Sequence, residues 1–255
     1  MKYMYAYRYV FESPKWMANL LAAIICYLVP VVGPIVFHGY GFEMIESLHR
    51  RKGARCPDFD TNRLSEYLNR GLWPFLVQLV AGLPIMVIVM VVSGGFAIGM
   101  ILTPEKHQAV ALALGVPLFV FAVLLLEVLA SVIVIPLLLR AGLTQEFGQA
   151  FSLVFVKDFI KRMWLELILQ QLFLHATSIV LSLVGLLACY VGSFVAVGLV
   201  AFAQIHIWHQ LYELYLERGG TPIPLKPGST DADEEDLPLV YEEPPTEGIQ
   251  PPQEP

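Results

Sequence analysis

Residues Leu72 to Leu102 read LWPFLVQLVAGLPIMVIVMVVSGGFAIGMIL, a run of 31 residues without one charged side chain. A helix rises about 1.5 Å per residue, so about 20 apolar residues cross a hydrocarbon core of about 30 Å. Three further apolar runs of similar character follow it, at Gln108 to Leu139, Met163 to Gly185 and Tyr190 to Leu211. The sequence therefore predicts an all-α polytopic membrane protein with four long transmembrane helices.

The composition supports a membrane protein with one helical domain. Hydrophobic residues make up 56% of the chain and charged residues only 15%, whereas soluble domains are about a quarter charged. We expect residues 1–218 to form the membrane domain. Residues 219–255 hold nine of the 22 acids and nine of the 18 prolines, which is typical of a disordered segment.

The basic residues predict how the helices cross the membrane, because lysine and arginine accumulate on the cytoplasmic side. Six lie between Gly41 and Gly71 and four between Arg140 and Arg162, but only Lys106 lies between the first two long runs. We therefore place both basic segments and the acidic tail on the cytoplasmic side of the membrane.

The first apolar run, Trp16 to Tyr40, is interrupted by Pro30, Gly33 and Pro34. If the prolines break it into a re-entrant helical hairpin, 15 of the 16 basic residues lie on one side. If it spans as one kinked helix, the split is 12 to 4. Each hairpin arm would have about fourteen residues, too few to span. We prefer the hairpin, and the kinked span stays as the alternative.

Two basic segments between the runs also have helical spacing of apolar residues. In Arg63 to Arg70 and in Phe147 to Arg162, apolar side chains recur among charged ones at the spacing of one helix face. We expect both segments to form amphipathic helices that lie along the inner membrane interface.

Glu127 is the one acid well inside an apolar run, and its placement is costly. A carboxylate at a helix centre costs at least about 2.5 kcal/mol, so it needs a partner, a proton or a wet cavity. Glu127 precedes Arg140 by thirteen residues and His175 follows Arg162 by thirteen, so both lie about 20 Å from the basic margin. We predict that Glu127 and His175 face each other inside the bundle. A polar stripe along the same helix face as His175 comprises Gln171, Ser178 and Ser182.

Other polar and small-residue patterns have simple structural interpretations. His206 and His209, among Trp208 and two tyrosines, predict an interfacial aromatic belt rather than a metal site. Gly95 and Gly99 indicate close helix packing, either within the chain or between chains. The stretch Cys56 to Asp60 predicts a turn followed by a helix that Asp60 or Thr61 caps. The sequence suggests no metal, no cofactor and no nucleic-acid partner.

The first seventy residues carry an ordered set of motifs that resembles a known prokaryotic membrane-protein family, domain of unknown function 4013. The resemblance covers roughly residues 8–215 and implies a polytopic inner-membrane protein without an assigned activity, cofactor or catalytic residue. The residues that carry it are Phe11, Pro14, Trp16, Pro34, Ile35, Gly39, Tyr40, Gly53, Pro57 to Asp60, and Gly71.

These observations favour a non-enzymatic membrane scaffold or assembly partner, in contact with lipid and with a membrane protein or a second copy of the chain. The alternative is a small transporter or ion pathway that uses Glu127 and His175. An intramembrane enzyme is a weaker third possibility, because the sequence contains no nucleophile elbow, phosphate-binding glycine loop or HExxH motif.

Overall fold

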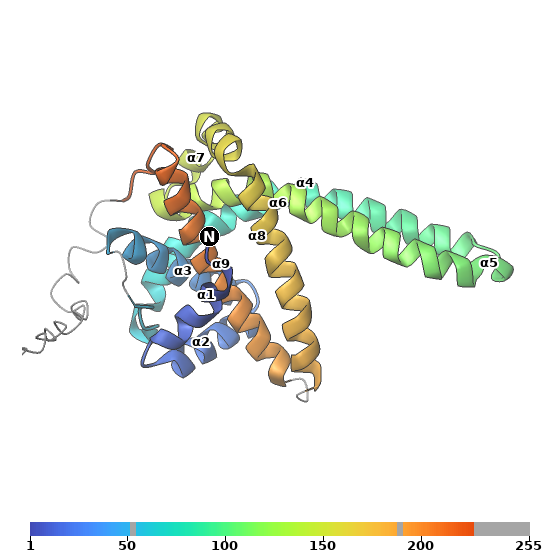
Figure 1. Cartoon of the computed structure of the whole chain (residues 1–255), viewed down its shortest axis with the longest axis horizontal. Coiled ribbons are helices and arrows are strands. Elements are labelled where there is room, and N and C mark those ends of the chain that lie inside the picture. Colours follow the sequence, from blue (N-terminus) through green and yellow to red (C-terminus); the bar gives the residue numbers. More distant parts are fainter. Residues whose placement is uncertain (52–54, 188–190, 227–255) are drawn as a thin grey trace, which may run out of the picture.

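The computed structural model describes residues 1–51, 55–187 and 191–226, and these ranges are helical with no strand. Four of their helices are long and apolar enough to cross a membrane, and one shorter apolar helix precedes them. The predicted all-α class with four candidate membrane spans is confirmed. Figure 1 shows two long helical hairpins that extend in different directions from a compact body.

The first hairpin forms an arm that reaches far beyond the body (Figure 1). Its first helix, α4 (Leu64–Leu102), ends at a tight turn that begins at Thr103. The second half of the hairpin is helical throughout and consists of three consecutive elements: α5 (Glu105–Val110), the π-helical segment η3 (Ala111–Gly115) and α6 (Val116–Thr144). Only 6% of the most apolar 18-residue stretch of α4, and 11% of that in α5 to α6, is buried within the chain.

The second hairpin consists of α8 (Leu153–Leu187) and α9 (Val191–Glu217), which pack along each other. It differs from the arm because α9 contacts three elements of the body, α1 (Tyr3–Arg8), α2 (Trp16–Leu28) and α3 (Val32–Arg50), whereas the arm meets the body mainly where α4 contacts α3. As a result 56% of the most apolar stretch of α9 is buried. Short elements complete the fold: η1 (Tyr9–Glu12), η2 (Thr61–Arg63) and α7 (Phe147–Ala150).

The first apolar run forms a helical hairpin, α2 followed by α3, and not one kinked helix. The break lies at Pro30 and Val31, where the Val32 amide donates to the Pro30 carbonyl over 2.8 Å. Val31 has φ 65° and ψ −64°, the geometry of a strained γ-turn. The second arm continues past the predicted end at Tyr40 to Arg50. The position of this hairpin relative to the membrane stays a prediction.

Glycines allow α3 and α4 to cross with their backbones in contact. A Cβ atom on Gly39 would lie 1.9 Å from the Tyr67 carbonyl oxygen, and one on Gly71 would lie 1.8 Å from the Ile35 carbonyl oxygen. Real Cβ atoms do not approach so closely, so only glycine fits at either position. Both glycines belong to the motif set of the sequence analysis, so two residues of that set are explained by the crossing of α3 and α4.

The two segments predicted to form interfacial helices are helical, and both are continuous with helices that are candidate membrane spans. Residues 64–70 are the first turns of α4, and residues 153–162 are the first turns of α8. In the second segment a break at Phe151 and Ser152 divides the short helix α7 from α8. Gly71 lies between the first segment and its apolar run without interrupting α4, and Met163 follows Arg162 directly in α8.

The beginning of the predicted tail packs on the body. Gly219, with φ 75°, ends α9, and the chain turns back so that the Ile223 amide donates to the Tyr212 hydroxyl over 2.9 Å. The Thr221 amide donates to the Tyr215 hydroxyl over 3.1 Å, and Ile223 is buried. The predicted disorder of residues 227–255 concerns a segment that lies outside the described residues.

Candidate functional site: an ionisable pair between the hairpins

The structure brings Glu127 of α6 and His175 of α8 into contact. His175 Nε2 lies 3.1 Å from Glu127 Oε2. Both residues are thirteen positions from the basic margin of their helices, and this equal spacing was enough to indicate the contact. What the pair does in the protein stays a prediction.

The pair lies at the outer edge of the α6–α8 crossing and not in the closed interior that we expected. The chain leaves 57% of the Glu127 side chain and 21% of the His175 side chain uncovered. The two hairpins diverge from the body (Figure 1), and the described residues leave more than half of the carboxylate side chain uncovered. The surface next to Glu127 therefore meets lipid, water or another polypeptide.

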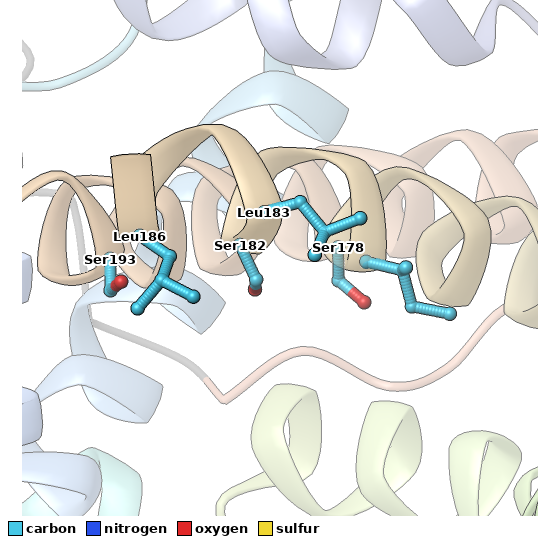
Figure 2. Close-up of a pocket in the computed structure, with 6 residues that line it drawn as sticks. Ser178, Ser182, Leu183, Leu186 and Ser193 are labelled. Atoms are coloured by element: carbon cyan, nitrogen blue, oxygen red, sulfur yellow. The ribbon is translucent and has the colours of Figure 1, made fainter. Parts of the chain in front are cut away.

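The predicted polar stripe of α8 surrounds His175 and continues away from it. The His175 Nδ1 atom lies 2.8 Å from the Gln171 carbonyl oxygen, and the Ser178 hydroxyl donates to the His175 carbonyl over 2.9 Å. Beyond His175, Ser178 and Ser182 line an open pocket of about 390 Å³ together with Ser193 of α9. Figure 2 shows the three serine side chains on one side of the α8–α9 hairpin.

The structure also has a charged network near the N-terminal end of α4, which the sequence did not predict. Arg70 and Glu46 form an ion pair whose side chains are only 6% and 1% exposed, and Arg70 also donates to the Phe42 carbonyl over 3.0 Å. Nearby, Arg63 binds both carboxylate oxygens of Glu43, at 2.9 and 3.0 Å. Burial raises the pKa of Glu43, and Arg63 opposes that shift. The network joins α3 to α4. Its only signal in the sequence was the spacing of Glu43, Glu46 and Arg50, which are three and four residues apart and so lie on one helix face.

The histidines of α9 lie in the body, so the prediction of an interfacial aromatic belt is wrong. His206 is 5% exposed and packs between the rings of Tyr5 and Tyr9, with ring centroids 5.4 and 4.5 Å away. Trp208 is buried as well. The reason is that α1 and η1 cover this face of α9, which the sequence pattern of α9 alone does not reveal.

The stretch from Cys56 to Asp60 has no regular secondary structure and leads into η2, whose predicted cap is Asp60. Asp60 caps η2 by accepting from the Asn62 amide over 2.8 Å, and the Tyr40 hydroxyl donates to the Pro57 carbonyl over 2.7 Å. Burial raises the pKa of the Cys56 thiol to about 12, so this cysteine stays protonated. The hydrogen bond between Tyr40 and Pro57 holds this stretch against α3.

The glycines of the two hairpins have different neighbours. A Cβ atom on Gly185 would lie 2.6 Å from the backbone carbon of Gly192, so α8 and α9 are in close contact there. At Gly95 and Gly99, by contrast, a Cβ atom would meet nothing within 4 Å. The second pattern is therefore not used for packing within the described chain.

The described ranges contain no group of three or more histidine, cysteine, aspartate or glutamate side chains placed to hold a metal ion. A second pocket of about 340 Å³ lies where the N-terminal residues meet α9, and His206, His209 and Glu213 are among its lining residues. Glu213 Oε1 also lies 2.5 Å from Nδ1 of His49 on α3, so this carboxylate already has a partner.

No curated protein and no solved structure matches the chain. One family matches residues 22–190, a range that includes Gly39, Tyr40 and Gly71 but not Phe11, Pro14 and Trp16. The match covers about two thirds of the sequence, and the chain therefore belongs to the family described as protein of unknown function, DUF4013.

Proposed function

We propose that this protein is a non-enzymatic membrane scaffold whose α4–α6 arm binds a second transmembrane helical hairpin, that of another copy of the chain. The observation that carries the proposal is the open glycine face of α4. Gly95 and Gly99 are four residues apart, and nothing in the described chain lies within 4 Å of a Cβ atom at either position.

A glycine face of this kind suits contact between identical helices. In lipid, helices associate through close backbone packing, and two small residues four positions apart allow that approach. A two-fold axis would place the same face of each copy against the other, so one pattern supplies both sides of the interface. Elsewhere in the chain, close approaches at glycine are already filled by its own helices, as at Gly71 and Gly185.

The motif residues that carry the family resemblance in the sequence analysis also support a structural role. Gly39 and Gly71 permit a helix crossing, Tyr40 holds a loop, and Asp60 caps a helix. None of them lines either of the two pockets described above. A compact body that carries an apolar arm is what an assembly partner in the membrane requires.

The test measures the oligomeric state of the full chain in lipid nanodiscs by single-molecule photobleaching. We expect the parent protein to give two bleaching steps, and Gly95→Leu together with Gly99→Leu to give one. The matched control is Gly82→Leu, because Gly82 is equally open but lies about 140° around α4 from Gly95 at 100° per residue. A parent protein that is monomeric, or a Gly82→Leu variant that dissociates equally, would contradict the proposal.

A second function, a small proton or ion pathway, is favoured by the contact of Glu127 with His175 and by the serine-lined pocket beyond it. Its test is the flux of protons and common cations into proteoliposomes. Transport through the pair predicts flux in the parent protein and at least a tenfold loss in Glu127→Gln. A parent protein without flux would exclude this function for the ions measured.

A further inference from the structure

The hydrogen bonds around the His175 ring determine which of its nitrogen atoms carries a proton. Nδ1 lies 2.8 Å from the backbone carbonyl oxygen of Gln171. A carbonyl oxygen has lone pairs and no hydrogen, so it can only accept. A bond of this length therefore requires that Nδ1 bears the hydrogen and donates it.

This assignment leaves the other nitrogen without a hydrogen in a neutral ring. A neutral imidazole has one N–H group, and the nitrogen opposite to it presents a lone pair. Nε2 would then face Glu127 Oε2 at 3.1 Å. An ionised carboxylate is also only an acceptor, so two lone pairs would face each other without a bond.

We propose that Glu127 and His175 together bind one additional proton, held between Oε2 and Nε2. With it, the pair is either a carboxylic acid that donates to a neutral imidazole or a carboxylate that accepts from an imidazolium. Both forms satisfy the 3.1 Å contact, and both are neutral overall. Without the proton the pair would carry a full negative charge at a depth where an uncompensated charge is costly.

One competing arrangement is possible and is weaker on the distances. The side-chain Nε2 of Gln171 lies 3.4 Å from His175 Nδ1, and it would donate to Nδ1 if the ring hydrogen were on Nε2 instead. A hydrogen bond of 3.4 Å is at the long limit, whereas 2.8 Å is near the optimum. That arrangement would also leave the Gln171 carbonyl oxygen opposite a lone pair at 2.8 Å, which is repulsive.

No other titratable side chain on the neighbouring helices competes for the proton. The sequence contains no other titratable side chain within two turns of Glu127 on α6 or of His175 on α8. The same is true of α4 from Leu72 onward and of α9 from Gly192 to Ile205. On the N-terminal side, Tyr7 is hydrogen-bonded to Thr177 at 2.6 Å. The acids of α3 face Arg63 and Arg70, and His49 faces Glu213.

The proton site does not depend on the proposed scaffold function. It follows from the atoms around one histidine, and it makes this part of the membrane domain a proton-binding site whether or not the protein conducts. A protein with the bound proton but no dimer would contradict only the scaffold, and a dimer without the proton would contradict only this inference.

The test combines two spectroscopic measurements on the full chain in lipid bilayers at pH 7. Nitrogen-15 NMR of histidine-labelled protein reports which ring nitrogens carry hydrogen, and the His175 signals are assigned by their loss in His175→Gln. Infrared spectra of the parent and of Glu127→Gln show whether Glu127 contributes a carboxylic acid band. We expect one of two results: His175 protonated on both nitrogens, or His175 protonated on Nδ1 with a carboxylic acid at Glu127.

The Glu127→Gln variant gives a second, independent readout. The glutamine amide donates an N–H to Nε2, so His175 should be neutral with its hydrogen on Nδ1. His107→Gln, at the tip of the arm, is the control that removes a different histidine signal. An ionised Glu127 beside a neutral His175 in the parent, with the ring hydrogen on either nitrogen, would overturn the proposal.

Discussion

In the two hairpins the more apolar helix is the less buried one, which is the opposite of what a soluble protein shows. The stretch of α4 in the arm has a mean hydropathy of 2.7 and is 6% buried, whereas that of α9 has 1.4 and is 56% buried. In a bilayer the hydrocarbon solvates apolar side chains as well as a protein core does, so burial there follows close packing and polar contacts. The more polar helix is the buried one because it needs protein partners.

The same comparison explains why small residues must be examined together with their neighbours. Gly185 lies against the backbone of Gly192, whereas Gly95 meets no atom of the described chain. Similar patterns in the sequence therefore mark an internal contact in one hairpin and an open surface in the other. The following experiments test this difference, from the largest expected effect to the smallest.

The largest loss of stability is expected at the inner end of α4, where the arm joins the body. Glu46→Leu would leave the Arg70 guanidinium buried without its carboxylate, and removing one member of a buried ion pair costs about 3–5 kcal/mol. Equilibrium unfolding in detergent measures this change. Glu66→Gln is the control, because Glu66 pairs with Arg63 at an exposed position and such pairs contribute about 0–1 kcal/mol. Equal losses in both variants would contradict the distinction.

A smaller loss is expected where α3 crosses α4. In Gly71→Leu the new side chain would collide with the Ile35 carbonyl oxygen, and overpacking of this kind costs about 1–3 kcal/mol. Gly95→Leu lies on the same helix without a neighbour, so its unfolding free energy should stay within about 0.5 kcal/mol of the parent in monomeric detergent solution. If Gly95→Leu were the more destabilised, the arm would have an internal contact that the structure lacks.

The outer ends of the hairpins should respond to alanine with opposite signs. Gly185→Ala places a methyl group 2.6 Å from the Gly192 backbone and should cost about 1–2 kcal/mol. Gly94→Ala meets open space, and alanine favours a helix over glycine by about 0.5–1 kcal/mol. Thermal unfolding of both variants measures the difference. Similar midpoints for the two would show that the hairpins are equally packed at these levels.

The smallest effect is expected at the turn between α2 and α3, and it is a gain. Val31 adopts a backbone conformation that costs a β-branched residue about 1–3 kcal/mol. Glycine relieves this strain but has more freedom in the unfolded chain, so Val31→Gly should stabilise the protein by about 1 kcal/mol in chemical unfolding. Val29→Gly, at an extended position, should be neutral or destabilising. A loss of stability in Val31→Gly would show that the turn is not strained.

The features that the sequence predicts well depend on position along single helices. Charge-free length identified the four spans, and equal spacing from the basic margin identified the contact between Glu127 and His175. Both rely on the constant rise of a helix, which sequence counting reproduces. The γ-turn at Val31 also follows a local signal, the proline beside it.

The features that the sequence missed depend on which helices meet. The acids at Glu43 and Glu46 resemble a solvated loop after an apolar run, yet α3 continues through them and buries Glu46 against Arg70. His206 resembles an interfacial residue until α1 and η1 cover it. The uncovered carboxylate of Glu127 was missed for the same reason, because the divergence of the two hairpins is a property of tertiary structure alone.

The burial of α9 has a consequence for how the protein is made. Lys2 and Gln210 are joined by a hydrogen bond of 2.6 Å between the Lys2 amide and the Gln210 side chain, across more than two hundred residues. The elements α1, α2 and α3 leave the ribosome before α9, a helix that all three contact. During translation α3 can pack against α4 early, but the faces of α1, α2 and α3 that contact α9 have to stay open until α9 has been made. These contacts therefore form late in synthesis, after α4, α6 and α8 have left the ribosome.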